Sequence, residues 1–98
     1  MITKTTVLTR PSVAVDFPLA ANPALQAHIN QTYAGTPLKL LSRTQSISQD
    51  LLTLIIVQQF ADQAALTEFE NDPQWVAFVA ERDAYAAANG IAISSSSN

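Results

Sequence analysis

The sequence predicts an α+β fold made of two strand–helix–strand halves in tandem, with a four-stranded antiparallel sheet covered by helices on one face. The 98-residue chain has only two glycines, Gly35 and Gly90. Each glycine closes a segment that opens with a polar residue and a proline, Asn22-Pro23 and Asp72-Pro73. An Asn or Asp N-cap, a proline in the first turn and a glycine past the last turn mark the two ends of a helix. Apolar and β-branched runs flank both segments, which indicates strands on either side of each helix.

The first half is predicted to contain a strand over 3–10, a helix over 23–34 and a polar edge strand over 38–48. Leu25, Ile29 and Tyr33, with Thr32 beside them, form the inward stripe of this helix. The second half is predicted to contain a strand over 51–59, a helical region over 63–89 and a strand over 91–95. Pro73 cannot donate a backbone hydrogen bond, so the helical region should break at Asp72-Pro73 and start again with a new cap. Residues 1–98 form one domain, whose polar tail at 94–98 is expected to be flexible.

The strand over 51–59 is apolar on both faces, which is unusual for a sheet with one face in water. Leu51, Thr53, Ile55 and Val57 alternate with Leu52, Leu54 and Ile56. Helices can cover only one of these faces, so we expect a second copy of the chain to cover the other. The connection after the first strand is also apolar and could form a second contact. The candidate interface residues are Val13, Val15, Phe17, Leu19, Leu52, Leu54 and Ile56.

Composition excludes several classes of protein. Charged residues make up 13% of the chain, against ~25% in an ordinary soluble domain, and the net charge is −3. The five basic residues are scattered, which argues against a nucleic-acid partner. No apolar run is long enough to span a membrane, and no signal peptide is evident, so we expect a soluble protein of the cytoplasm or of a virion. The chain has no cysteine, which excludes disulfides and thiolate metal sites.

The predicted element order β-α-β-β-α-β resembles the ferredoxin-like fold, in which the first and third strands are central. The stretch from Phe60 to Phe69, followed by Asp72-Pro73 and a longer helix, looks like the second half of the dimeric α/β-barrel proteins. The resemblance implies that two sheets pack face to face, in a superfamily that includes cofactor-free monooxygenases and haem-degrading enzymes. Separately, Leu8-Thr9-Arg10-Pro11 and the segment from Glu81 to Tyr85 with Asn89-Gly90 resemble small uncharacterised proteins of tailed bacteriophages.

Residues with potential chemistry are few. His28 is the only histidine and could be a base or a haem ligand, but haem-degrading members of the superfamily place their histidine on the second helix. A half-buried imidazole bonded to a backbone group is the simpler interpretation. The aromatic residues could line a pocket or could be core. Arg82 could clamp an anion, pair with a nearby carboxylate or cover the tryptophan. The pocket candidates are His28, Tyr33, Trp75, Arg82 and Tyr85.

Two functional classes remain open. We favour a non-enzymatic structural or interaction protein that associates with itself or joins a larger assembly such as a phage virion, because no catalytic, cofactor or metal constellation is evident. The alternative is a small dimeric α/β-barrel enzyme, such as a cofactor-independent monooxygenase acting on an aromatic small molecule. A ligand-sized pocket would favour the enzyme, and a stable oligomer that does not respond to quinols or haem would favour the assembly protein.

Overall fold

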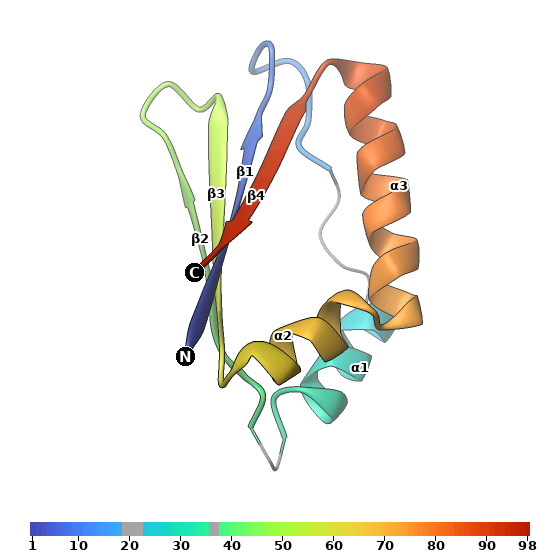
Figure 1. Cartoon of the computed structure of the whole chain (residues 1–98). Helices are drawn as coiled ribbons and strands as arrows, with labels where there is room; N and C mark the ends of the chain where they lie inside the picture. The colour runs from blue at the N-terminus through green and yellow to red at the C-terminus, as the bar shows by residue number, and fades with distance from the viewer. Residues whose placement is uncertain (19–22, 36–37) are drawn as a thin grey trace.

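A computed structural model describes residues 1–18, 23–35 and 38–98 of the chain, and these residues form one sheet with helices on one face (Figure 1). The elements agree closely with those predicted. In chain order they are β1 (Ile2–Thr9), α1 (Pro23–Thr32), β2 (Leu40–Ile47), β3 (Thr53–Phe60), α2 (Gln63–Glu70), α3 (Pro73–Asn89) and β4 (Ala92–Ser97). None of the helices in the described ranges has the length and hydropathy needed to cross a bilayer.

The sheet has the order β2-β3-β1-β4, and its neighbouring strands are antiparallel. β1 and β3 are therefore central, as the sequence predicted. This arrangement is the four-stranded antiparallel sheet of a ferredoxin-like α+β fold, which confirms the predicted fold class.

Local capping residues set the helix ends in the second half. Asp62 Oδ1 accepts a hydrogen bond from the Ala65 amide at 2.8 Å and caps α2. Asp72 Oδ1 accepts one from the Gln74 amide at 2.9 Å and caps α3, with Pro73 in the first turn. Gly90 ends α3 in the left-handed conformation at φ 71°, where a side chain would be strained. The predicted break at Asp72-Pro73, the predicted cap Asp72 and the predicted end at Gly90 are confirmed, whereas the predicted cap Asn22 lies outside the described residues.

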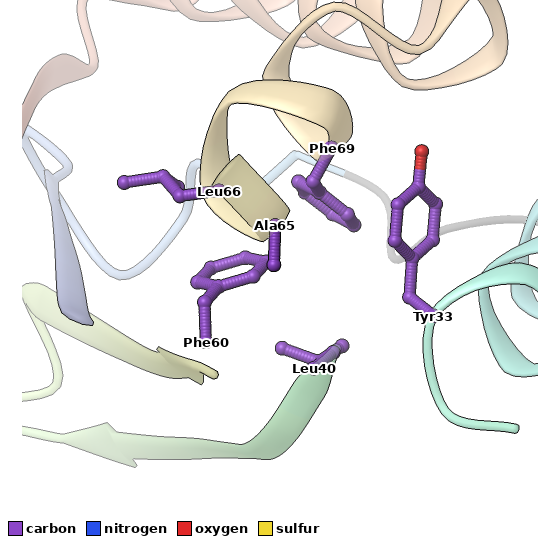
Figure 2. Packing of buried hydrophobic residues seen from close by; sticks show 6 residues of the cluster. All are labelled: Tyr33, Leu40, Phe60, Ala65, Leu66 and Phe69. Atoms are coloured by element: carbon purple, nitrogen blue, oxygen red, sulfur yellow. The ribbon is translucent and has the colours of Figure 1, made fainter. Parts of the chain in front are cut away.

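The apolar core consists of two separate clusters. The first joins the end of the sheet at Phe60 to α2 and to the chain after α1 (Figure 2). Its buried members are Tyr33, Leu40, Phe60, Ala65, Leu66 and Phe69. The second cluster is smaller and contains Leu8, Ala86 and Ile91, with partly buried residues packed around it.

The strand register corrects our assignment of the sheet faces. Leu54 and Ile56 pack against the second cluster, on the face that the helices cover. Their alternates Ile55 and Val57 therefore lie on the outer face, where Val7 is the partner of Ile55 across the β1–β3 pair. Alternation alone could not distinguish the two faces, because both are apolar in sequence.

β3 begins two residues later than predicted because a turn precedes it. Leu51 has φ 64°, a left-handed conformation that is incompatible with a strand. Asp50 Oδ1 stabilises the turn by accepting hydrogen bonds from the Ser48 hydroxyl and the Leu52 amide. Leu52, a predicted interface residue, therefore lies before β3 and not within it.

The predicted polar tail at 94–98 is part of the sheet. β4 pairs with β1 as far as Ser97, and the Asn98 amide donates to the Thr3 carbonyl at 3.0 Å. The expectation of a flexible tail was wrong because backbone groups, and not side chains, form the ladder with β1. The Thr6 and Ser95 hydroxyls add a side-chain hydrogen bond at 3.2 Å.

The connection after β1 folds back onto its own domain. Val15 and Phe17 pack against the second core cluster, and the Tyr85 hydroxyl donates to the Asp16 carbonyl at 2.7 Å. Of the residues predicted to contact a partner from this connection, Val13 is 59% exposed and Leu19 lies outside the described residues.

Candidate functional site

A cavity of about 580 Å³ lies between the sheet and the helices, where the two core clusters do not meet. Ile29 and Trp75 pack against the first cluster and Leu54 and Ile56 against the second, and all four also line the cavity. The cavity therefore occupies the gap between the clusters. Its other lining residues are Thr6, Leu8, Phe17, Pro18, Gln26, Asn30, Leu40, Arg43, Gln45, Gln58, Phe78 and Arg82.

Aromatic rings form the part of the cavity wall that α3 contributes. The rings of Trp75 and Phe78 have centroids 5.3 Å apart, and Trp75 also stacks on buried Phe69 at 4.6 Å. Phe69 anchors this row of rings in the core, because its side chain is fully buried. Phe17 contributes a further ring from the connection after β1. Such a wall suits a planar apolar ligand.

Polar groups enter the cavity from the sheet. Arg43 on β2 is the register partner of Gln58 on β3, which places their Cβ atoms about 5 Å apart. Gln58 is only 3% exposed. Its side chain makes no hydrogen bond in the described part of the chain. Every fully buried side-chain nitrogen or oxygen atom there has a partner, so the amide atoms of Gln58 cannot be fully buried. The Gln58 amide group must therefore be open to the cavity that it lines.

Two arginines supply the formal charge of the cavity wall. The guanidinium of Arg82 lies at the cavity and at the exposed carboxylate of Asp83, with Nε donating to Oδ1 at 3.3 Å. Arg43 is an exposed residue, and desolvation by neighbouring protein groups lowers the pKa of its guanidinium below the usual arginine value. Arginine nevertheless stays protonated in proteins, so both side chains are cations. No aspartate or glutamate is among the described lining residues.

The pocket residues proposed from sequence divide into two groups. Trp75 and Arg82 line the cavity. His28 and Tyr33 do not line it, and neither does Tyr85, whose hydroxyl is bound to the Asp16 carbonyl. Arg43 and Gln58 were not predicted from sequence as pocket residues, because they approach each other only through the pairing of β2 with β3.

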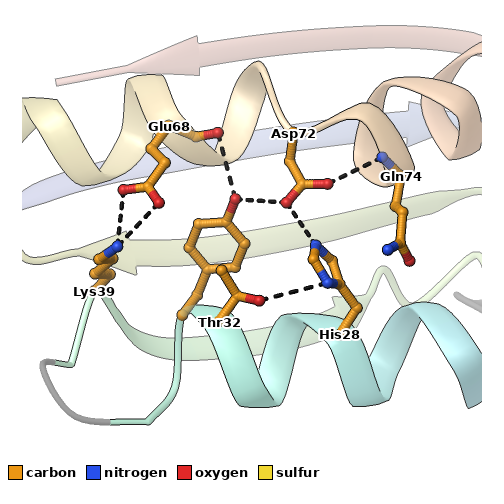
Figure 3. A network of polar contacts seen from close by, with 7 residues as sticks. His28, Thr32, Lys39, Glu68, Asp72 and Gln74 are labelled. Atoms are coloured by element: carbon orange, nitrogen blue, oxygen red, sulfur yellow. Dashed lines mark hydrogen bonds and ion pairs between the residues drawn. The ribbon is translucent and has the colours of Figure 1, made fainter.

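His28 and Tyr33 instead belong to a polar network that joins α1 to the junction of α2 and α3 (Figure 3). Asp72 Oδ2 lies 2.6 Å from His28 Nε2 and 2.7 Å from the Tyr33 hydroxyl. His28 was expected to bond to a backbone group, but its partner here is the carboxylate that caps α3. The Thr32 hydroxyl lies 3.4 Å from the other ring nitrogen of His28.

Protonation in this network follows from burial and hydrogen bonding. Burial of Asp72 would raise its pKa, but hydrogen bonds from His28, Tyr33 and the Gln74 amide outweigh burial and leave the pKa below the usual aspartate value. Burial, and then the hydrogen bond to Asp72, raises the pKa of Tyr33 well above its usual value. Tyr33 therefore stays a protonated donor and Asp72 a charged acceptor. The network is a structural connection between helices.

No protein-family model and no curated protein matches the chain. Among solved structures, the chain is similar to a putative antibiotic biosynthesis monooxygenase from Deinococcus radiodurans, with 11% identity and a TM-score of 0.60. This match covers 100% of the chain and 90% of the other protein. The chain is also similar to Rv0793 from Mycobacterium tuberculosis, with 16% identity, a TM-score of 0.47 and coverage of 98% and 93% of the two chains.

These comparisons correct the function that we favoured from sequence. The protein that shares the fold over the whole chain is described as a monooxygenase, which contradicts a non-enzymatic virion component and agrees better with the enzyme alternative. The resemblance to phage proteins receives no support from the comparisons. At 11% identity the likeness shows the fold alone. The chain thus has a ferredoxin-like fold.

Proposed function

We propose that this protein is a small cofactor-independent monooxygenase that acts on an aromatic small molecule. The observation that carries the proposal is the cavity of about 580 Å³ between the sheet and the helices. Its size lies within the range of ~300–1,000 Å³ that is usual for small-molecule sites. Its wall combines the rings of Phe17, Trp75 and Phe78 with a few polar groups, which is the composition expected of such sites.

A quinol is a suitable substrate because it can supply all the electrons of the reaction. For 1,4-dihydroxynaphthalene, one oxygen atom of O2 becomes a new hydroxyl at ring carbon 2, and the other leaves as water. The product is 2-hydroxy-1,4-naphthoquinone. Four electrons leave the substrate, two from the quinol-to-quinone conversion and two from the C–H bond that becomes C–OH. The reaction needs no further reductant, and the protein would hold and orient the substrate.

We further propose that a second copy of the chain covers the outer face of the sheet. Val7, Ile55 and Val57 lie together there through the β1–β3 register, and the helices cover the opposite face. Threonine and serine surround these three side chains on the neighbouring strands. An apolar centre with a polar, uncharged rim is a composition that can pack against an identical sheet.

The test combines 18O2 labelling with a variant that fills the cavity. We expect the protein to incorporate one 18O atom into the hydroxynaphthoquinone formed from 1,4-dihydroxynaphthalene, and Ile56→Phe to abolish this incorporation. Val76→Phe is the matched control, because it adds a ring at a position on α3 that is 50% exposed and does not line the cavity. Trp75 is the only tryptophan and lines the cavity, so its fluorescence reports occupancy. Labelling no greater than in protein-free buffer, together with unchanged Trp75 fluorescence, would refute the proposal.

A further inference from the structure

We propose that the aromatic ligand of this cavity binds as an anion, either a carboxylate or a phenolate, and that Arg43 together with the Gln58 amide binds the anionic oxygens. The inference rests on the proposed function and adds the charge of the ligand to it. Arg43 and Gln58, on neighbouring strands, bind the anionic group of the ligand, whereas the aromatic wall on α3 binds its ring system.

The charged residues that line the cavity favour an anionic ligand. The chain has eight acidic and five basic residues, so a cavity placed at random would be lined by acids more often than by bases. Two of the basic residues, Arg43 and Arg82, line this cavity, and no acidic residue is among its described lining residues. A cavity lined by cationic groups and by no described acidic residue favours an anionic ligand, because low-dielectric walls focus the field of the cations.

The Arg43 guanidinium has no hydrogen-bond acceptor or ion-pair partner within the described part of the chain. The other four basic side chains each have an acceptor there. Lys4 binds Glu70 and Lys39 binds Glu68. Arg10 donates to the carbonyls of Leu51 and Val15, and Arg82 donates to Asp83. Arg43 makes no such bond, although protein groups partly desolvate its guanidinium. A ligand anion would restore the interactions that this cation loses.

The side-chain amide of Gln58 offers a second hydrogen-bond donor beside Arg43. Gln58 is only 3% exposed, and its side-chain amide makes no hydrogen bond within the described residues. The NH2 group can donate to an anionic oxygen next to the Arg43 guanidinium, because the two residues are register partners. A carboxylate, or a phenolate with a neighbouring oxygen, offers acceptors to both donors. A neutral hydrocarbon would leave the NH2 donor of the buried Gln58 without an acceptor, which is costly.

The experiment compares two ligands of nearly the same shape, naphthalene-2-carboxylate and naphthalene-2-carboxamide, by isothermal titration calorimetry of the full chain. We expect the carboxylate to bind about tenfold more tightly, as one charge-assisted hydrogen-bond pair would give. Arg43→Gln should reduce this ratio to near one and leave amide binding unchanged. Lys39→Gln is the matched control, since it removes a cation that lies outside the cavity and should keep the ratio.

The outcomes separate this inference from the proposed function. Equal affinity of the wild-type protein for the two ligands would overturn the inference and leave the aromatic site intact. A tenfold preference that persists in Arg43→Gln would overturn the role of Arg43. Failure of both ligands to bind would overturn the aromatic site and the inference together. Circular dichroism checks the fold of Arg43→Gln, which should be native because Arg43 lies on an edge strand and its side chain makes no hydrogen bond to a described residue.

Discussion

Replacing Asp72 with alanine should destabilise the protein far more than removing an ordinary helix cap. The carboxylate accepts hydrogen bonds from three places: the Gln74 amide at the start of α3, His28 on α1 and the Tyr33 hydroxyl after α1. His28 Nε2 must be the donor, because an ionised carboxylate only accepts. Asp72 is 8% exposed and Tyr33 is 1% exposed, so water cannot readily replace the bond between them.

The magnitude can be worked out bond by bond. Loss of the α3 cap costs about 1 kcal/mol. Loss of its acceptor leaves the buried Tyr33 hydroxyl without a good partner, at ~1–3 kcal/mol, because the Glu68 carbonyl is 3.4 Å away. His28 is 26% exposed and can turn to water, so its loss costs only about 0.5 kcal/mol. The sum is about 2.5–4.5 kcal/mol, a large share of the ~5–15 kcal/mol that stabilises a typical domain.

Equilibrium unfolding in urea, followed by Trp75 fluorescence, measures this loss. Asp62→Ala is the matched control, because Asp62 caps α2 through a single bond to the Ala65 amide and should cost about 1 kcal/mol. Tyr33→Phe, made alone and with Asp72→Ala, completes a double-mutant cycle, for which we expect a coupling of about 1–2 kcal/mol. The reasoning is refuted if Asp72→Ala costs no more than Asp62→Ala, or if the cycle shows no coupling.

The other predictions concern pH and assembly. The pKa of Asp72 is lower in the folded protein than in the unfolded chain, so its contribution to the free energy of unfolding is fully present above about pH 4 and is lost as the pH falls through the folded value. Urea titrations from pH 6 to pH 2.5 should therefore show a steeper loss in the wild type than in Asp72→Asn, and parallel curves would contradict this account. Ile55→Asp on the outer sheet face should convert an oligomer to a monomer in light scattering, whereas Val76→Asp, at a position on α3 that is 50% exposed, should not. A wild-type protein that is monomeric at micromolar concentration would exclude this interface.

The elements could be predicted from sequence because their signals are local. Asp72-Pro73 and Gly90 each act within one helical turn, and the structure has both in the predicted roles. The faces of β3 could not be predicted, because Leu54 and Ile56 are as apolar as Ile55 and Val57. Only the packing of the helices decides which pair is covered.

The candidate site could be predicted only where its residues share one element. Trp75 and Arg82 are seven residues apart on α3 and so share one helix face, which the sequence analysis recognised. Arg43 and Gln58 are 15 residues apart by their numbers, on different strands, and only the β2–β3 register makes them neighbours. A polar side chain at the end of an apolar strand, such as Gln58, was the available signal.

The positions of the titratable groups limit what the cavity can do chemically. The only histidine and the buried aspartate bind each other outside the cavity, so neither is placed to take a proton from a bound ligand. The charged lining residues that the structure describes are arginines, which do not act as bases at neutral pH. A substrate of this cavity would therefore have to ionise without a protein base. A cation such as Arg43 favours that ionisation by stabilising the anion.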